Sequence, residues 1–203
     1  MRAGELQFPE QVYITAECAS FLKSKEGFGG LSNMAGGFGL RVQGHPVKSS
    51  EALYQALKFP DSPAAQRTIL DKPSPMTAKW AAKGFIKQGL LRPDWDQVEV
   101  EVMRWCLRLK LAQNPRTMGR ILSATGELPI VEIAAKKDGF WGAVREQDGT
   151  VLRGRNVLGC LLTELRQVYR AVEMDERQNT PAPGFDCRLL GQPVTAHREK
   201  SPV

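Results

Sequence analysis

The sequence predicts an α+β fold: a single domain that is mostly helical and contains a few short strands. With 203 residues, of which 42% are hydrophobic, the chain is long enough for one domain with a sizeable core. Apolar residues at helical spacing and residues typical of helix boundaries recur along it, whereas runs of strand-forming residues are few and short. This mixture is typical of the α+β class.

The strands are expected in three places. Residues 12–15 are good strand formers, and residues 40–42 and 45–48 flank Gln43-Gly44 as the two arms of a small hairpin do. A further strand is expected over residues 129–133.

Helices are expected over most of the remaining chain. Ser49 or Ser50 is a suitable N-cap for the first, Asp94 with Gln97 forms a candidate capping box, and Asn156 is placed to cap the last. The expected ranges are 49–59, 62–71, a helix that opens at Ser74-Pro75, 84–90, 94–113, 115–126 and a long final helix from 156.

We expect residues 1–12 to form an N-terminal extension, residues 13–170 the domain, and residues 171–203 an extended, proline-containing tail without a catalytic role. No apolar run approaches the ~18 residues of a membrane-spanning helix, and the N-terminus lacks the apolar stretch of a secretory signal. The four cysteines are far apart and there are only two histidines. We therefore expect a cytoplasmic protein with reduced thiols, no metal, no cofactor and no membrane partner.

The formal net charge of +6 favours a partner that carries phosphate, either a nucleotide or a nucleic-acid backbone, although many proteins are mildly basic. The most unusual segment is 49–59. On a helix, Glu51, Gln55 and Lys58 have the spacing i, i+4, i+7 and project from one face, as an acid–base array beside a pocket would. The alternative is a solvated face whose carboxylate is favoured by the helix N-terminus.

Other polar groups are candidates for binding. Residues 27–39 contain six glycines in thirteen positions, and Ser32 and Asn33 lie among them. Asn33 could form hydrogen bonds to a ribose or a base; the alternative is that it is a turn residue. Arg92 is suited to bind a phosphate and Trp95 to stack on a base. The alternative is that Arg92 is a loop residue and Trp95 belongs to the core.

Two further groups lie near the last helix. Asp138 stands three residues before Trp141 in a glycine-flanked loop that continues into Gly142. Arg155 and Asn156 open the last helix, where unpaired amides favour an anion; the alternative is a simple asparagine cap.

In order along the chain, these segments resemble the NADAR family, also called YbiA-like. The G-x-(L/F)-S-N-(F/M) block, the (T/S)-S-E-x-x-Y-Q-A-x-(K/R)-F block and the R-x-x-W block are similar to residues 29–34, 49–59 and 92–95. Three later blocks are similar to residues 102–110, to Glu132 with Asp138, Trp141 and Gly142, and to residues 154–166. The resemblance covers residues 13–170.

The resemblance implies an enzyme that hydrolyses N-glycosidic bonds of ADP-ribose-like or phosphoribosyl compounds. Glu51 would stabilise the charge that develops at the ribose C1 or activate water, with Asp138 as the second carboxylate. Lys58 would protonate the departing base, hold a ribose hydroxyl or trap the opened sugar as an imine. The residues expected to bind substrate are Ser32, Asn33, Tyr54, Gln55, Arg92, Trp95, Trp141, Gly142, Arg155 and Asn156.

Two activities belong to the family that the chain resembles: removal of ADP-ribose from guanine in DNA or RNA, and hydrolysis of phosphoribosylated riboflavin-pathway intermediates. Ala143 stands where many bacterial members of that family carry an acid or a glycine, and the segment 50–54 differs from the riboflavin-type pattern. Both departures make the first activity our leading expectation, with a cognate ADP-ribosyltransferase toxin as a partner. The alternatives are the riboflavin activity, a non-catalytic sensor of NAD or ADP-ribose, and a plain nucleic-acid-binding module.

Overall fold

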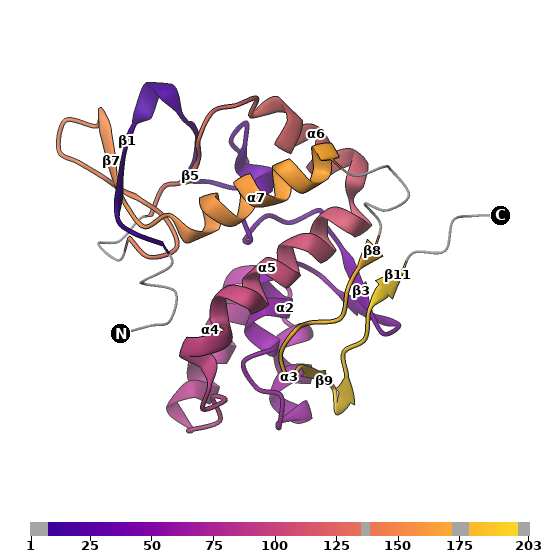
Figure 1. The fold of residues 1–203 in the computed structure, drawn as a ribbon. Coiled ribbons are helices and arrows are strands. Elements are labelled where there is room, and N and C mark those ends of the chain that lie inside the picture. Colours follow the sequence, from indigo (N-terminus) through magenta and orange to yellow (C-terminus); the bar gives the residue numbers. More distant parts are fainter. Residues whose placement is uncertain (1–7, 135–138, 172–178, 199–203) are drawn as a thin grey trace. The chain divides into compact units, whose positions relative to one another are not determined.

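The structure is a computed structural model that describes residues 8–134, 139–171 and 179–198. The chain divides into two compact units, and each is built from two separate segments. Unit 1 contains Met1–Ser32 and Arg116–Val172, and unit 2 contains Asn33–Pro115 and Glu173–Val203. Helices and several short strands occur together, so the predicted α+β class is confirmed (Figure 1).

The described residues of unit 1 form two small sheets. Strands β1 (Gln11–Ile14), β7 (Val151–Gly154) and β6 (Val144–Arg145) form an antiparallel sheet in the order β1-β7-β6. Strand β2 (Ala19–Phe21) pairs in parallel with β5 (Ile130–Glu132). A buried cluster joins both sheets, and its members are Tyr13, Val131, Ile133, Ala143 and Leu152.

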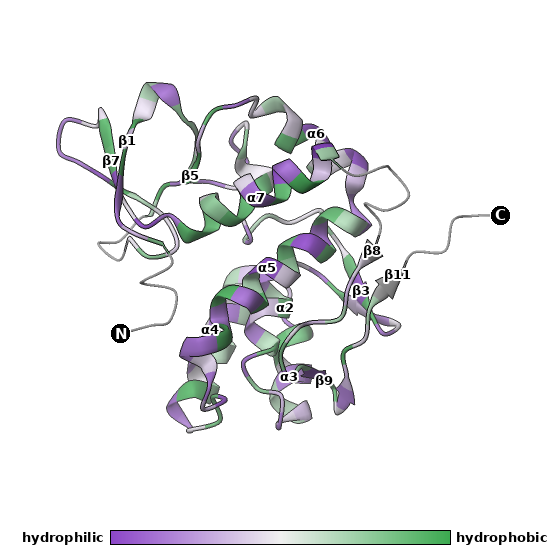
Figure 2. Cartoon of the chain, in the orientation of Figure 1, coloured by the Kyte–Doolittle hydropathy of each residue, from purple (hydrophilic) through white to green (hydrophobic). Residues whose placement is uncertain are grey.

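The helices of unit 1 are α6 (Pro115–Ala124) and α7 (Val157–Ala171), with 3-10 turns η1 (Thr15–Glu17) and η2 (Gly29–Leu31). Green and purple alternate along α7 in Figure 2, as expected for a helix with one buried face. Leu158, Leu161 and Leu162 lie on that face, and α7 packs against β5.

Unit 2 begins with the predicted hairpin. Strands β3 (Leu40–Val42) and β4 (His45–Val47) are antiparallel, and Val42 lies opposite His45. The two residues between them, Gln43 and Gly44, have φ angles of 49° and 82°. Positive φ at both positions gives the tight turn that suits the twist of a two-residue hairpin.

Four helices follow: α2 (Ser50–Ala56), α3 (Pro63–Leu70), α4 (Pro75–Lys87) and α5 (Trp95–Gln113). Ser49 caps α2, as expected, because its hydroxyl accepts from the amide of Ala52 at 3.1 Å. Ser74 and Thr77 form a capping box at α4. Helix α2 contacts α3, α4 and α5, which surround it within the unit.

The described part of the C-terminal segment belongs to unit 2. It forms the pairs β8 (Asn179–Thr180) with β11 (His197–Arg198), and β9 (Arg188–Leu189) with β10 (Gln192–Pro193). The Trp105 indole donates to the Pro181 carbonyl at 2.9 Å, and the Gln66 amide bonds to the backbone of Arg188 and Leu190. This segment is therefore held against the helices, a pairing that the sequence did not predict.

Two expectations about helices were wrong, and three strands of unit 1 were missed. One helix, α4, runs through Lys87 where a separate helix over 84–90 was expected, and α2 ends at Ala56 rather than near residue 59. Strands β2, β6 and β7 were missed, because two- to four-residue strands depend on a partner for their stability. Within the described ranges, no helix has the length and apolarity needed to cross a membrane.

Lys110 of α5 is fully buried, and its Nζ lies 4.2 Å from the centroid of the Phe38 ring. Burial lowers the pKa of Lys110 from 10.5 to about 7, because the ammonium loses its hydration.

The unfolded chain therefore keeps the Lys110 proton above pH 7 while the folded chain releases it. We expect the free energy of unfolding to rise with pH between about 7 and 8.5, and Lys110 contributes up to about 1.4 kcal/mol per pH unit to this rise. Above this window the cysteine thiols of the unfolded chain titrate as well. Urea denaturation of wild type and Lys110→Met across this window measures the rise. The prediction fails if both proteins show the same slope.

Candidate active site

Helix α2 is buried along its whole length, and this includes the carboxylate of Glu51, which is only 4% exposed. Its Oε1 accepts from Nε2 of Gln55 at 2.8 Å, and its Oε2 accepts from Nδ2 of Asn33 at 2.7 Å. A buried carboxylate is costly unless it is hydrogen-bonded, and these two amides supply the bonds. The alternative of a solvated helix face is wrong.

Asn33 also holds the start of α2. Its backbone carbonyl accepts from the amide of Glu51 and from the hydroxyl of Ser50, each at 3.2 Å. The side-chain Oδ1 of Asn33 is buried and has no hydrogen-bond partner among the described residues. Because the Glu51 carboxylate would repel this oxygen, the amide turns its NH2 group to Glu51 and leaves Oδ1 as an open acceptor.

The ammonium of Lys58 lies beside two aromatic rings. Its Nζ is 5.2 Å from the centroid of Tyr54 and 4.9 Å from that of Trp95, and the two rings pack edge to face at 5.2 Å. Lys58 follows the end of α2, so it does not continue the helical stripe of Glu51 and Gln55 as expected.

Arg92 is 5% exposed and forms hydrogen bonds with both Lys58 and Asp94. Its amide donates to the Lys58 carbonyl at 3.0 Å, while Nε and Nη2 donate to Oδ1 and Oδ2 of Asp94 at 2.6 and 2.8 Å. Hydrogen bonding from Arg92 lowers the pKa of Asp94. The carboxylate therefore does not cap α5, and the expected capping box was wrong. The Nη1 of Arg92 is buried without a hydrogen-bond partner in the part of the chain that is described.

In unit 1, four consecutive amides where the chain enters α7 are bonded to the preceding loop. The amides of residues 155–158 donate to the carbonyls of Gly139, Gly142, Phe140 and Trp141, respectively. The expectation that these amides form an anion seat was wrong, because each is already bonded. Trp141 packs edge to face on Phe140, with 5.2 Å between ring centroids.

Asn156 binds strand β5 rather than capping α7. Its Nδ2 donates to the Ile130 carbonyl at 2.8 Å, and its Oδ1 accepts from the Glu132 amide at 3.1 Å. Its φ of 49° is a conformation that asparagine tolerates better than most residues. The predicted cap was therefore wrong. Arg155 directs its Nη1 to the Phe8 carbonyl at 2.8 Å.

Sequence reasoning passed over Glu132 as a site residue. Its Oε1 lies 3.5 Å from the Ser32 hydroxyl, which places a second carboxylate beside a predicted binding residue. Its place in the block with Trp141 and Gly142 that resembles the NADAR pattern was the available signal. A side chain at Gly142 would collide with the Glu132 carbonyl, which explains the glycine. Asp138 lies outside the described residues, and no metal-binding cluster occurs among the described ones.

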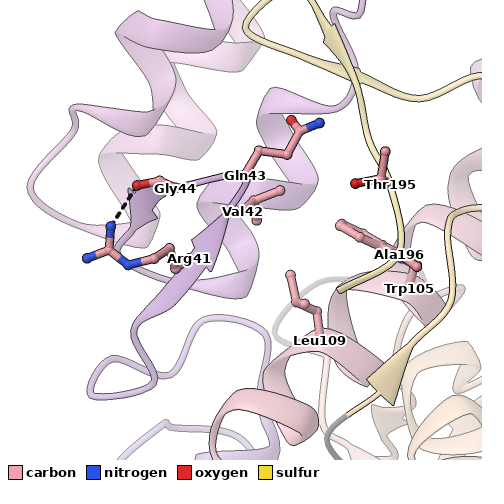
Figure 3. Close-up of a pocket in the computed structure, with 8 residues that line it drawn as sticks. All are labelled: Arg41, Val42, Gln43, Gly44, Trp105, Leu109, Thr195 and Ala196. Atoms are coloured by element: carbon pink, nitrogen blue, oxygen red, sulfur yellow. Dashed lines mark hydrogen bonds between the residues drawn. The ribbon is translucent and has the colours of Figure 1, made fainter. Parts of the chain in front are cut away.

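A cavity of about 220 Å³ lies elsewhere in unit 2, between the β3–β4 hairpin, α5 and the C-terminal segment (Figure 3). Its lining includes Val42, Leu109 and Ala196, while the Arg41 guanidinium turns back to the Gly44 carbonyl. None of the predicted site residues lines it, so we do not place the chemistry there.

The structure thus brings together two groups in unit 2: Asn33 with Glu51 and Gln55, and Lys58 with Tyr54 and Trp95, to which Arg92 is linked. The other predicted residues that are described belong to unit 1 and are Ser32, Trp141, Gly142, Arg155 and Asn156. That these residues are catalytic or bind substrate stays a prediction.

Replacing Asn33 by Asp would set two buried carboxylates against each other. We expect Asn33→Asp to lose about 2–4 kcal/mol of unfolding free energy at pH 7, with part of the loss recovered near pH 4 as one carboxyl is protonated. The double variant Asn33→Asp/Glu51→Gln restores an amide–carboxylate pair, and denaturant titration should show recovery of at least half the loss. Additive losses would contradict this pairing.

Gly159 in α7 has no room for a side chain. A Cβ there would clash with the Ile130 carbonyl and with the Asn156 amide. We expect Gly159→Ala to cost about 1–3 kcal/mol in urea denaturation. The matched change Gly84→Ala, in α4 with nothing within 4 Å, should be neutral or stabilise by up to about 1 kcal/mol. Equal effects of the two changes would refute this explanation.

Comparison with known proteins identifies the family of this chain. The model of the NADAR domain matches residues 20–170. N-glycosidase YbiA of Escherichia coli is 34% identical over 148 residues, which are 73% of this chain and 86% of that protein. The NMR structure of E. coli YbiA superimposes with a TM-score of 0.63 at 30% identity, over 84% of this chain and 92% of that one.

A protein named riboflavin biosynthesis protein VVA0006, from Vibrio vulnificus, is 36% identical over 132 residues. These cover 63% of this chain but only 32% of the Vibrio protein. The match of the family model over most of the chain, together with the likeness to YbiA in both sequence and structure, shows that this chain belongs to the NADAR domain family.

Proposed function

We propose that the chain uses Glu51 to hydrolyse the bond between a ribose C1 and the nitrogen of a base. As a member of a family whose relatives are named N-glycosidases, it is a hydrolase of N-glycosyl bonds. The observation that carries the proposal is the buried Glu51 carboxylate, held by Asn33 and Gln55 with one amide on each oxygen.

The chemistry needs such a group. As the C1–N bond breaks, positive charge develops over C1 and the ring oxygen, and a nearby carboxylate stabilises it more strongly away from bulk water. Water then forms the new C1–O bond, and the departing base takes up a proton. The two amides orient the Glu51 carboxylate in advance, so little reorganisation is needed during the reaction.

Other polar groups of unit 2 suit the rest of the substrate. The buried Oδ1 of Asn33 is an acceptor beside the carboxylate, as a ribose hydroxyl requires. The Nη1 of buried Arg92 is a donor with charge, as a phosphate requires. Lys58, held at the rings of Tyr54 and Trp95, would protonate the base or bind a ribose hydroxyl.

The finer proposal is that the substrate is ADP-ribose attached to guanine in DNA or RNA. The net charge of +6 and the departures at residues 50–54 and Ala143 support it. The likeness to VVA0006 favours a second candidate, a phosphoribosylated riboflavin-pathway intermediate. Parallel assays with ADP-ribosylated oligonucleotide and with a phosphoribosylamino-pyrimidine discriminate, and tight binding of ADP-ribose without turnover of either would indicate a sensor.

Glu51→Gln keeps the size of the side chain and removes its charge. We expect kcat/KM for release of ADP-ribose to fall by at least about 100-fold, with only a small change in melting temperature, because the Asn33 amide can turn its unpartnered Oδ1 to accept from the new NH2 group. Glu101→Gln, the same change at an exposed position of α5, should leave the rate intact. No release by wild type, or unchanged release by Glu51→Gln, would reject the proposal.

A further inference from the structure

Most of the chain's net positive charge is concentrated in one stretch. Residues 62–93, which form α3, α4 and their connections, contain six basic side chains and one acidic one. Their net charge of +5 compares with +6 for all 203 residues. Helix α4 itself has three lysines and no acidic residue.

One side of α4 is exposed and unusual in composition. Trp80 is 62% exposed and Met76 is 46% exposed, and Lys79, Lys83 and Lys87 are exposed as well. Positions 76, 80, 83 and 87 follow the i, i+4, i+7, i+11 spacing of a single helix face, and Lys79 lies at its edge. We name these five residues the α4 face. No ion pair engages its lysines among the described residues.

The opposite side of α4 is used for packing. Ala78 and Ala82 are fully buried, α4 contacts both α2 and α3, and the Phe85 ring packs on Phe59 with 5.8 Å between centroids. The α4 face therefore stands on the helix next to α2, which carries Glu51, within the same unit (Figure 1). Packing does not explain why an indole is left in water.

We propose that the α4 face binds single-stranded nucleic acid, with an unpaired base stacked on Trp80 and phosphates held by Lys79, Lys83 and Lys87. The three lysines recur every four residues, about 6 Å along the helix, so the row spans about 12 Å and several phosphates. Exposed aromatics beside lysines are the usual means of binding single strands without reading their sequence. An anionic membrane fits less well, because the face offers only two apolar side chains.

This inference deepens the proposed function, since it gives the modified nucleic acid a binding surface outside the catalytic residues. Its test does not depend on turnover. A fluorescently labelled, unmodified single-stranded 12-mer is titrated with protein in anisotropy experiments at several salt concentrations. We expect the logarithm of the binding constant to fall against the logarithm of salt with a slope of about −2 for three phosphate contacts.

Trp80→Ala should weaken binding by roughly 5- to 100-fold, whereas Trp80→Phe should retain much of it. Lys83→Gln/Lys87→Gln should make the salt slope shallower by more than one. The matched control is Lys23→Gln/Lys25→Gln, which removes the same charge at exposed positions of unit 1 and should not change the slope. Unchanged binding by the α4 variants, or binding of phosphatidylserine vesicles in preference to the 12-mer, would overturn the proposal.

The two proposals fail separately. If the α4 variants still hydrolyse a mononucleoside ADP-ribosyl-guanosine at the wild-type rate but lose activity on the oligonucleotide, the face serves the substrate's nucleic acid. Hydrolysis of the small substrate without α4-dependent binding of the 12-mer would reject the face and leave the proposed activity standing. Binding of the 12-mer with no hydrolysis of any glycoside would reject the proposed activity and leave the α4 face standing as a nucleic-acid-binding surface.

Discussion

The hydrogen bond between Asn33 and Glu51 is the constraint on which the candidate site depends. A carboxylate buried on α2 would destabilise the fold unless donors replaced its lost water. Asn33 supplies one donor, and its backbone carbonyl also accepts from the Glu51 amide and the Ser50 hydroxyl, so one residue both compensates the charge and locates the helix. The interaction that makes the burial tolerable therefore also orients the proposed catalytic group.

In unit 1 a single asparagine likewise links two elements, because Asn156 at the start of α7 forms hydrogen bonds with β5. Its amide satisfies one carbonyl and one amide of a three-residue strand that is too short to be stable alone. Gly159 permits this close approach, and the loop carbonyls of residues 139–142 bond to the first amides of α7. Asn156 and Gly159 lie in a block that resembles the family pattern, yet both have a role in the fold. Replacing either would therefore reduce activity even if the residue does not touch substrate.

Positive charge is divided between two environments. Arg92 and Lys110 are buried, where each is held by a specific neighbour: a carboxylate for Arg92 and the Phe38 ring for Lys110. The lysines of α4 are exposed and form no ion pair among the described residues, so they remain available to an external anion. Desolvation restricts the buried Arg92 guanidinium to one geometry and lowers the pKa of Lys110, whereas hydrated lysines tolerate many arrangements of phosphate.

From the sequence we could predict the α+β class, the hairpin at Gln43-Gly44, the caps at Ser49 and Ser74, and the common helix face of Glu51 and Gln55, because each depends on residues that are close along the chain. The folded structure was needed to show that α2 is buried, that Asn33 binds Glu51, that Asp94 binds Arg92 instead of capping α5, and that Asn156 binds β5. It also decided the pairing of β2 with β5, which are more than a hundred residues apart. Local spacing shows which side chains share a face, but burial and the choice among competing hydrogen-bond partners depend on segments that only folding brings together.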